Sequence, residues 1–275
     1  METRGRQTRL VAPIHFEMAS HVKIRLEGIH KAFRVKGAPL PVLEGVDLYA
    51  REGEFVALIG PSGCGKSTLL NVIAGLDEPD SGLIELDGRP SPRRLGRMGY
   101  MQQKDLLMPW RTVVDNAVLA LELRGVSRSV ARRRALELID VFGLRGFEGQ
   151  LPFALSGGMR QRVAFLRTLL ADSDILLLDE PFGALDAYTR AQMQQWLLEV
   201  WRAFRKTIVF ISHDVEEALF LSDRMYVLTA RPARVKLEVT VDVSRPRTLE
   251  VVTSEPFVKL KGRLLTALYE GGDVR

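Results

Sequence analysis

The sequence contains very little cysteine and no long hydrophobic run. Its only cysteine, Cys64, excludes an intrachain disulfide and a cysteine-based zinc site in these 275 residues. No uninterrupted apolar run exceeds six residues, whereas a membrane-spanning helix needs about 20. We therefore expect no membrane-spanning helix in this chain.

Neither sign of charge dominates the sequence. The 39 lysines and arginines exceed the 34 aspartates and glutamates by five. Such a mild basic excess suits nucleic acid, anionic lipid or a phosphate ligand, and it selects none of them. With 46% hydrophobic and 27% charged residues, the composition is close to that of globular proteins, which excludes a disordered or fibrous chain.

The hydrophobic pattern begins as antiparallel β-structure and then becomes parallel α/β. Apolar and polar residues alternate over 22–26 and again over 42–49, on either side of a turn predicted at 37–41. The run Phe55–Ile59 is continuously apolar, as in a strand covered on both faces. A helix is predicted over Lys66–Ala74, directly after a glycine-rich loop.

The second half of the pattern predicts an inserted helical region and a return to the sheet. Apolar residues repeat at helical spacing within 113–155, including Ala135, Leu136, Ile139 and Val141. Buried strands are then predicted at 175–178 and 208–211, and a closing helix at 257–268. The sequence thus predicts a mostly parallel sheet flanked by helices.

A phosphate-binding loop is the most specific motif. Residues 60–67 fit G-x-x-x-x-G-K-[ST] between a buried strand and a helix. The glycines let several backbone N–H groups point inward, and the helix N-terminus adds positive potential. Lys66 would reach the β and γ phosphates, and Ser67 would offer its hydroxyl to Mg²⁺. Cys64, at a variable position, is either a small space-filler or a redox-sensitive thiol.

Two adjacent carboxylates follow the strand predicted at 175–178. The carboxyl edge of a parallel sheet is where open α/β folds bind ligands. There Asp179 can reach Mg²⁺ through water, and Glu180 can orient or deprotonate the water that attacks the γ phosphate. Taken alone, such a pair also fits a solvated strand end.

A second candidate anion site lies at Leu-Ser-Gly-Gly-Met-Arg-Gln, residues 155–161. Ser156 is a good helix N-cap, and that role alone would account for it. The hydroxyl, the glycine pair and the helix N-terminus also suit a phosphate. A chain with two such helix ends needs either two nucleotides or a partner.

The order of these motifs resembles the ATP-binding subunit of an ABC transporter, over about residues 20–245. The resemblance implies a P-loop NTPase fold with an N-terminal antiparallel β subdomain and a helical subdomain inserted at about 104–165. The ATPase domain would span 21–245, between a flexible extension at 1–20 and a C-terminal extension at 246–275. It also implies a head-to-tail homodimer with ATP between the phosphate loop of one copy and Ser156 to Gly158 of the other.

The resemblance further assigns site residues. Phe33, expected in a loop after the first strand, would stack on adenine, and His213 would contact the γ phosphate. Gln103, preferred to Gln102 because it stands seven residues before Trp110, would sense Mg²⁺ and the membrane partner. The implied catalytic residues are Glu180, His213 and Lys66, and the metal-binding residues are Ser67, Gln103 and Asp179. The implied ATP contacts are Phe33, Gly60, Pro61, Ser62, Gly63, Cys64, Gly65, Lys66, Ser67, Thr68, Ser156, Gly157, Gly158 and Asp186.

The implied function is ATP hydrolysis that energises a bacterial-type importer at the cytoplasmic face of the inner membrane. The implied partners are two permease subunits, which would dock near 106–110, and, indirectly, an extracytoplasmic solute-binding protein. The segment 100–112 and the motifs Arg231-Pro232 and Arg245-Pro246-Arg247 are similar to importers of nitrate, sulfonates, taurine or hydroxymethylpyrimidine. The cargo would be an organic anion or a pyrimidine precursor.

One alternative is a soluble ABC ATPase that acts on nucleic acid or ribosomes. Such proteins usually carry a long coiled coil, zinc-binding cysteines or a second ATPase unit, and the sequence shows none of these. We therefore expect no nucleic-acid partner. A small-molecule kinase with a P-loop would lack the 155–161 motif.

Overall fold

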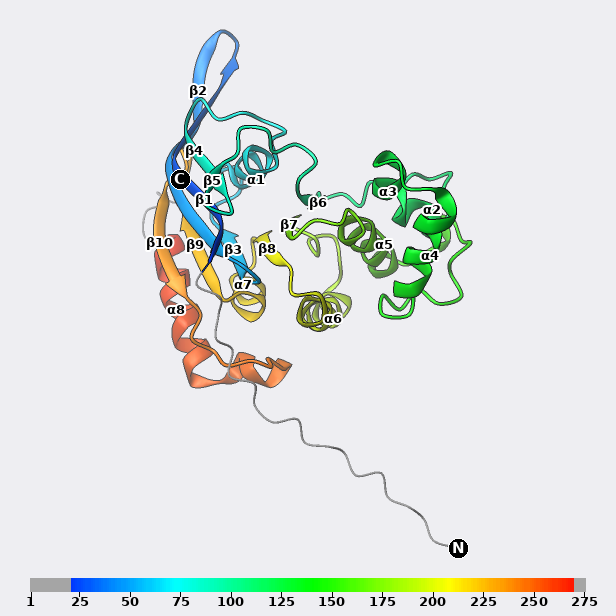
Figure 1. The fold of residues 1–275 in the computed structure, drawn as a ribbon. Helices are drawn as coiled ribbons and strands as arrows, with labels where there is room; N and C mark the ends of the chain where they lie inside the picture. Colours follow the sequence, from blue (N-terminus) through cyan, green and yellow to red (C-terminus); the bar gives the residue numbers. More distant parts are fainter. Residues whose placement is uncertain (1–20, 270–275) are drawn as a thin grey trace, which may run out of the picture.

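The six-stranded sheet forms the centre of the molecule (Figure 1). The computed structural model describes residues 21–269, so the extension predicted at 1–20 lies outside the described residues. Five strands of this sheet are parallel, and only β10 runs antiparallel to its neighbour β9. The order is β10 (Val235–Thr240), β9 (Arg224–Leu228), β3 (Phe55–Ile59), β8 (Thr207–Ile211), β7 (Ile175–Asp179) and β6 (Gly99–Met101).

The N-terminal β-structure is antiparallel, as predicted, but its strands are longer than expected. Its order is β2 (Ala38–Arg51), β1 (Val22–Val35), β4 (Ser81–Leu86) and β5 (Arg89–Pro90). The turn predicted at 37–41 was wrong in extent, because β2 already begins at Ala38. The loop predicted around Phe33 was also wrong, since Phe33 lies in β1 and pairs with Leu40. Cross-strand pairing thus continues through the prolines on which the turn prediction was based.

Alternating side chains of β3 enter two separate hydrophobic cores. Phe55, Ala57 and Ile59 belong to one cluster. Val56 and Leu58 belong to the other, with the inner residues of β1 and β2. Because successive strand residues point to opposite faces, a continuously apolar strand requires cover on both sides. This burial holds the carboxyl end of β3, where the phosphate loop begins.

The helices predicted within 113–155 lie between β6 and β7 in the chain and, in Figure 1, on the side opposite the β1–β2 hairpin. They are α2 (Val113–Ala117), α3 (Leu119–Leu123) and α4 (Arg128–Leu138), followed by α5 (Gly157–Leu169). The expected apolar face of α4 was partly wrong, because Leu136 and the nearby Val141 are about half exposed. Ala131 and Ala135 supply the buried face instead.

The remaining helices cover the parallel sheet. They are α1 (Lys66–Ala74), α6 (Ala187–Phe204), α7 (Val215–Leu221) and α8 (Glu255–Tyr269), with short 3-10 turns at Pro152–Ala154 and Leu249–Thr253. α8 runs beside β10 in Figure 1 and buries Phe257 and Leu264. Within residues 21–269, no helix combines the length and apolar character needed to cross a membrane.

A buried arginine from the C-terminal extension closes the end of α7. The guanidinium of Arg247 is 3% exposed and donates to the backbone carbonyls of Leu219, Phe220 and Ser222 at 3.0, 3.0 and 2.6 Å. It also donates to the carbonyl of Val243. The carbonyls at the end of α7 lack the donor that a further helical turn would supply. The C-terminal extension is therefore bonded to the helix that follows His213.

We expect Arg247→Leu to lower the free energy of unfolding by about 2–4 kcal/mol, because several buried carbonyls lose their donor. Chemical denaturation of the purified protein measures this change. Arg263→Leu, at an exposed position of α8, is the matched control and should stay within about 0.5 kcal/mol of the wild type. Equal stability of both variants would show that Arg247 does not hold α7.

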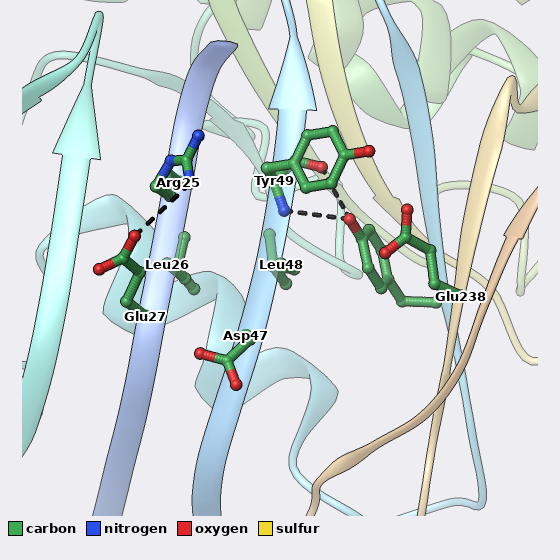
Figure 2. Close-up of a pocket in the computed structure, with 8 residues that line it drawn as sticks. Arg25, Leu26, Glu27, Asp47, Leu48, Tyr49 and Glu238 are labelled. Atoms are coloured by element: carbon green, nitrogen blue, oxygen red, sulfur yellow. Dashed lines mark hydrogen bonds and ion pairs between the residues drawn. The ribbon is translucent and has the colours of Figure 1, made fainter.

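A pocket of about 420 Å³ lies where the two sheets meet, beside β1, β2, β9 and β10 (Figure 2). Most of its charged groups are paired locally, and Asp47 accepts a hydrogen bond from the N–H of Gly28 at 2.7 Å. Arg25 pairs with Glu27 and Glu85, and Glu238 pairs with Arg224. None of the site residues predicted from the sequence lines it.

Candidate functional site

The predicted catalytic and metal-binding residues converge on one edge of the parallel sheet. The phosphate loop follows β3, Glu180 follows β7, His213 follows β8 and Gln103 follows β6. Because these strands are parallel and adjacent, their carboxyl ends share an edge. The topology thus brings together residues that are up to 153 positions apart, from Gly60 to His213.

The phosphate loop has a backbone that only glycine accommodates at its end. Gly65 has φ +127°, and a Cβ there would lie 2.9 Å from Cγ1 of Val42. The helix α1 begins directly after it. Lys66 is 6% exposed, and its Nζ donates to the carbonyls of Gly60 and Pro61 at 2.8 and 3.0 Å. The loop therefore gathers N–H groups, a helix N-terminus and one buried ammonium around a space suited to phosphate.

Cys64 lies inside this loop with its thiol buried. It is 1% exposed, and its Sγ packs against Gly60. Burial raises the pKa of Cys64 and outweighs the opposite effect of nearby Lys66. A buried, protonated thiol is a weak nucleophile, so the environment favours the space-filling interpretation.

Asp179 is a buried carboxylate next to the phosphate loop. It is 7% exposed and hydrogen-bonded to the hydroxyl of Ser67. Burial raises the pKa of Asp179, Glu180 adds to the rise, and Ser67 and Lys66 oppose it. A nearby cation would stabilise the ionised form of this buried carboxylate. Ser67, Asp179 and Gln103 carry oxygen atoms of the kind that Mg²⁺ prefers, and their role as its ligands stays a prediction.

Glu180 is the point where three strand ends meet. Its Oε2 accepts a hydrogen bond from Nε2 of Gln103 at 3.0 Å and lies 3.5 Å from Nδ1 of His213. Its backbone N–H donates to the carbonyl of Ile211 at 3.1 Å. Glu180 also has φ +44°, a conformation that a non-glycine residue adopts at some cost. The surrounding structure therefore fixes this carboxylate in place.

The glutamine in contact with Glu180 is the one that the sequence favoured. Gln103, not Gln102, makes the hydrogen bond described above. Gln103 uses its side-chain nitrogen in this hydrogen bond, so its side-chain oxygen can bind another partner. The functional role of Gln103 stays a prediction.

The 155–161 motif begins α5, and both interpretations of Ser156 fit the geometry. Its Oγ accepts a hydrogen bond from the N–H of Met159 at 3.3 Å, so Ser156 is an N-cap. Cβ atoms at Gly157 and Gly158 would lie 3.3 Å from Leu185 and 3.1 Å from Thr189, respectively. The glycine pair thus lets α5 pack closely against the start of α6 and the residues just before it. Within the part of the chain that the structure describes, no hydrogen bond or ion pair joins this motif to the phosphate loop.

In the described range 21–269, neither Asp186 nor Phe33 forms a hydrogen bond or ion pair with the cluster around Glu180. Asp186 caps α6 by accepting from the N–H of Thr189 at 3.0 Å, and this bond lowers the pKa of Asp186. Phe33 is 37% exposed, with Nζ of Lys31 5.5 Å from its ring centroid. An exposed aromatic face is available for stacking, and its contact with adenine stays a prediction.

Sequence reasoning missed one residue that contacts the phosphate loop. Arg231, after β9, donates two hydrogen bonds to the carbonyl of Gly63. The sequence singled out Arg231 only as part of a motif shared with importer subunits. The signal that could have found it is its place at the carboxyl end of a strand neighbouring β3.

The chain is similar to a large set of known proteins. The family model described as ABC transporter matches residues 43–183. An uncharacterized ABC transporter ATP-binding protein of Methanocaldococcus jannaschii is 45% identical over 247 residues, which cover 90% of this chain and 91% of the relative. An aliphatic sulfonates import ATP-binding protein of Bacillus cereus is 39% identical, covering 90% of this chain and 97% of the relative.

Two further comparisons concern import and nucleotide binding. A taurine import ATP-binding protein of Rhizobium johnstonii is 43% identical, covering 87% of this chain and 93% of the relative. The dimeric structure of an ATP-binding cassette in a post-hydrolysis state, bound to ADP and Pi, has a TM-score of 0.68 and 31% identity. It covers 80% of this chain and 100% of that chain.

Proposed function

Because the chain belongs to the ABC transporter family, as its ATP-binding and ATP-hydrolysing subunit, we propose that it energises the import of a small organic anion. One observation supports the catalytic part most strongly. Gln103 and His213 both contact the carboxylate of Glu180, directly beside Asp179 and the phosphate loop. This arrangement has the groups that ATP hydrolysis needs: a phosphate cradle and a base for water.

Each group has a separate task in the proposed reaction. The phosphate loop and Lys66 hold the β and γ phosphates and offset their charge. Glu180 orients the attacking water and takes up its proton, and His213 contacts the γ phosphate. Ser156 to Gly158 of a second copy close the site from the opposite side. Hydrolysis then removes the phosphate that joins the two copies, and the dimer reopens.

Mg²⁺ would be held by the oxygen atoms of Ser67, Asp179 and Gln103. The ion would supply positive charge to the phosphate oxygens when bound. The hydrogen bond between Ser67 and Asp179 keeps these two groups together, so the chain itself preorganises this part of the site.

The proposed cargo is an organosulfonate or a related small anion. The support is the similarity to sulfonate and taurine import subunits over about nine-tenths of the chain. In this proposal two permease subunits carry the solute, a solute-binding protein delivers it, and this chain works at the cytoplasmic face of the membrane.

Uptake by the assembled transporter tests the proposal. The complex is isolated through a tag on this chain, reconstituted in liposomes with ATP inside, and offered labelled taurine, an alkanesulfonate or nitrate together with the solute-binding protein. We expect ATP-dependent uptake of a sulfonate. Recovery of the chain on ribosomes or DNA, with no membrane subunits, would instead support the nucleic-acid alternative.

The proposed docking surface for the permeases lies between the end of β6 and α2. Trp110 is 74% exposed and Leu106 is 50% exposed. The backbone at Asp105 and Leu106 is held in place, because Arg167 donates to their carbonyls at 2.6 and 2.7 Å. Exposed apolar side chains on a rigid segment are typical of protein interfaces.

We expect Trp110→Ala to weaken association with the permease subunits by about 10–100-fold, as for a central aromatic contact. ATP binding by the isolated chain should not change, since Trp110 lies outside the phosphate site. Tyr269→Ala removes an equally exposed aromatic, 75% exposed on α8, and is the control. Equal weakening by both variants would contradict a docking role for Trp110.

A further inference from the structure

The strand β9, the fifth of the parallel strands, also ends at this edge of the sheet. The proposed function gives no role to the residues that follow it. β9 lies beside β3 and is followed by a turn that leads into β10. Leu228, the last residue of β9, packs against Gly60, since a Cβ on this glycine would lie 3.1 Å from that of Leu228. Arg231 follows three residues later, at the outer side of the phosphate loop.

The guanidinium of Arg231 binds the loop backbone at one carbonyl. Its Nε donates to the carbonyl oxygen of Gly63 at 3.1 Å, and its Nη2 donates to the same atom. Gly63 has φ +73°, a backbone conformation that glycine adopts without steric cost. Among residues 21–269, no carboxylate forms an ion pair with Arg231 within 4.0 Å. Its charge is therefore not neutralised by a direct partner beside the phosphate loop.

The backbone of the same turn fixes the other side of the loop. Ala233 is fully buried, and its N–H donates to the carbonyl of Val42 at 2.8 Å. Its carbonyl accepts from the N–H of Glu44 at 3.0 Å. Val42 in turn touches Gly65, where a Cβ would meet it at 2.9 Å. The turn after β9 thus supports the loop at Gly63 directly and at Gly65 through β2.

We propose that Arg231 is a positioning residue of the phosphate loop, which holds the Gly63 carbonyl outward so that the loop N–H groups face the nucleotide. This inference rests on the proposed ATPase function and adds a determinant of nucleotide affinity. A preformed loop loses less conformational freedom when phosphate binds. The positive charge of Arg231 also favours the polyphosphate from outside the cradle.

Binding of ADP to the isolated chain tests the proposal by calorimetry. We expect Arg231→Gln to raise the Kd for ADP about 10-fold, the size of one lost charge-assisted contact. Arg231→Lys, which retains the charge and one donor, should recover part of the affinity. With saturating ATP, the kcat of Arg231→Gln should stay within about two-fold of the wild type, because Glu180 is untouched.

Arg234→Gln is the matched control, since Arg234 is an exposed arginine of the same turn that pairs with Glu44 at 2.7 Å. Its Kd for ADP should equal that of the wild type. An unchanged Kd in Arg231→Gln, or the same increase in both variants, would overturn the proposal. The measurement needs neither membrane subunits nor a solute, so its failure would leave the proposed transport role intact.

Discussion

A Glu180→Gln protein is expected to bind ATP as tightly as the wild type but to hydrolyse it about 10²–10⁴-fold more slowly, the usual effect of a lost general base. Glutamine keeps the shape of the side chain and can still contact Gln103 and His213. It cannot accept a proton from water. We therefore also expect ATP to trap the variant as a dimer, measured by phosphate release and by sedimentation with ATP.

Glu137→Gln is the control for this substitution, because Glu137 is an exposed carboxylate of α4 far from the phosphate loop in sequence. It should hydrolyse ATP at the wild-type rate. Near-normal turnover in Glu180→Gln would reject Glu180 as the base. Weakened ATP binding would show instead that its contacts support the nucleotide site.

Ser156→Arg is expected to reduce hydrolysis below about one hundredth of the wild-type rate, since a bulky cation replaces the hydroxyl that would face the γ phosphate. Nucleotide binding by the monomer should be nearly unchanged. The physical reason is that Ser156 is the N-cap of α5 and, among the residues that the structure describes, makes no hydrogen bond with the phosphate loop of its own copy. Phosphate release and ADP calorimetry measure the two effects separately.

Loss of the N-cap at Ser156 costs about 1 kcal/mol of stability, so a matched variant is needed. Ser127→Arg places the same residue at the N-cap of α4, where the serine side chain makes no capping hydrogen bond. This control should retain wild-type hydrolysis. If Ser156→Arg weakened ADP binding by the monomer as much as it slowed hydrolysis, the two-copy site would be wrong.

Local patterns predicted much of the fold. The strand Phe55–Ile59 and the helix Lys66–Ala74 have the expected bounds, because burial on both faces and the loop motif act over short distances. The antiparallel start, the parallel sheet and the closing helix were also predicted. These features all depend on periodicity or on residues that are close in sequence.

Contacts between distant segments were harder to predict. Phe33 lies in a strand because β1 pairs with β2 through two prolines, and turn-forming residues concealed this pairing. Leu136 is exposed because the small side chains of Ala131 and Ala135 form the buried face of α4. Arg231 contacts Gly63 across 168 positions, and no local pattern records such a contact.

Mixing two inactive variants tests most directly whether each ATP site is shared between two copies. Lys66→Ala removes the phosphate-binding side of a site, and Ser156→Arg removes the opposite side. In a mixed dimer both lesions fall in one site and leave the other intact. An equal mixture should therefore regain hydrolysis, up to about a quarter of the wild-type rate for a symmetric dimer that pairs at random. A mixture as inactive as its parents would contradict the shared site.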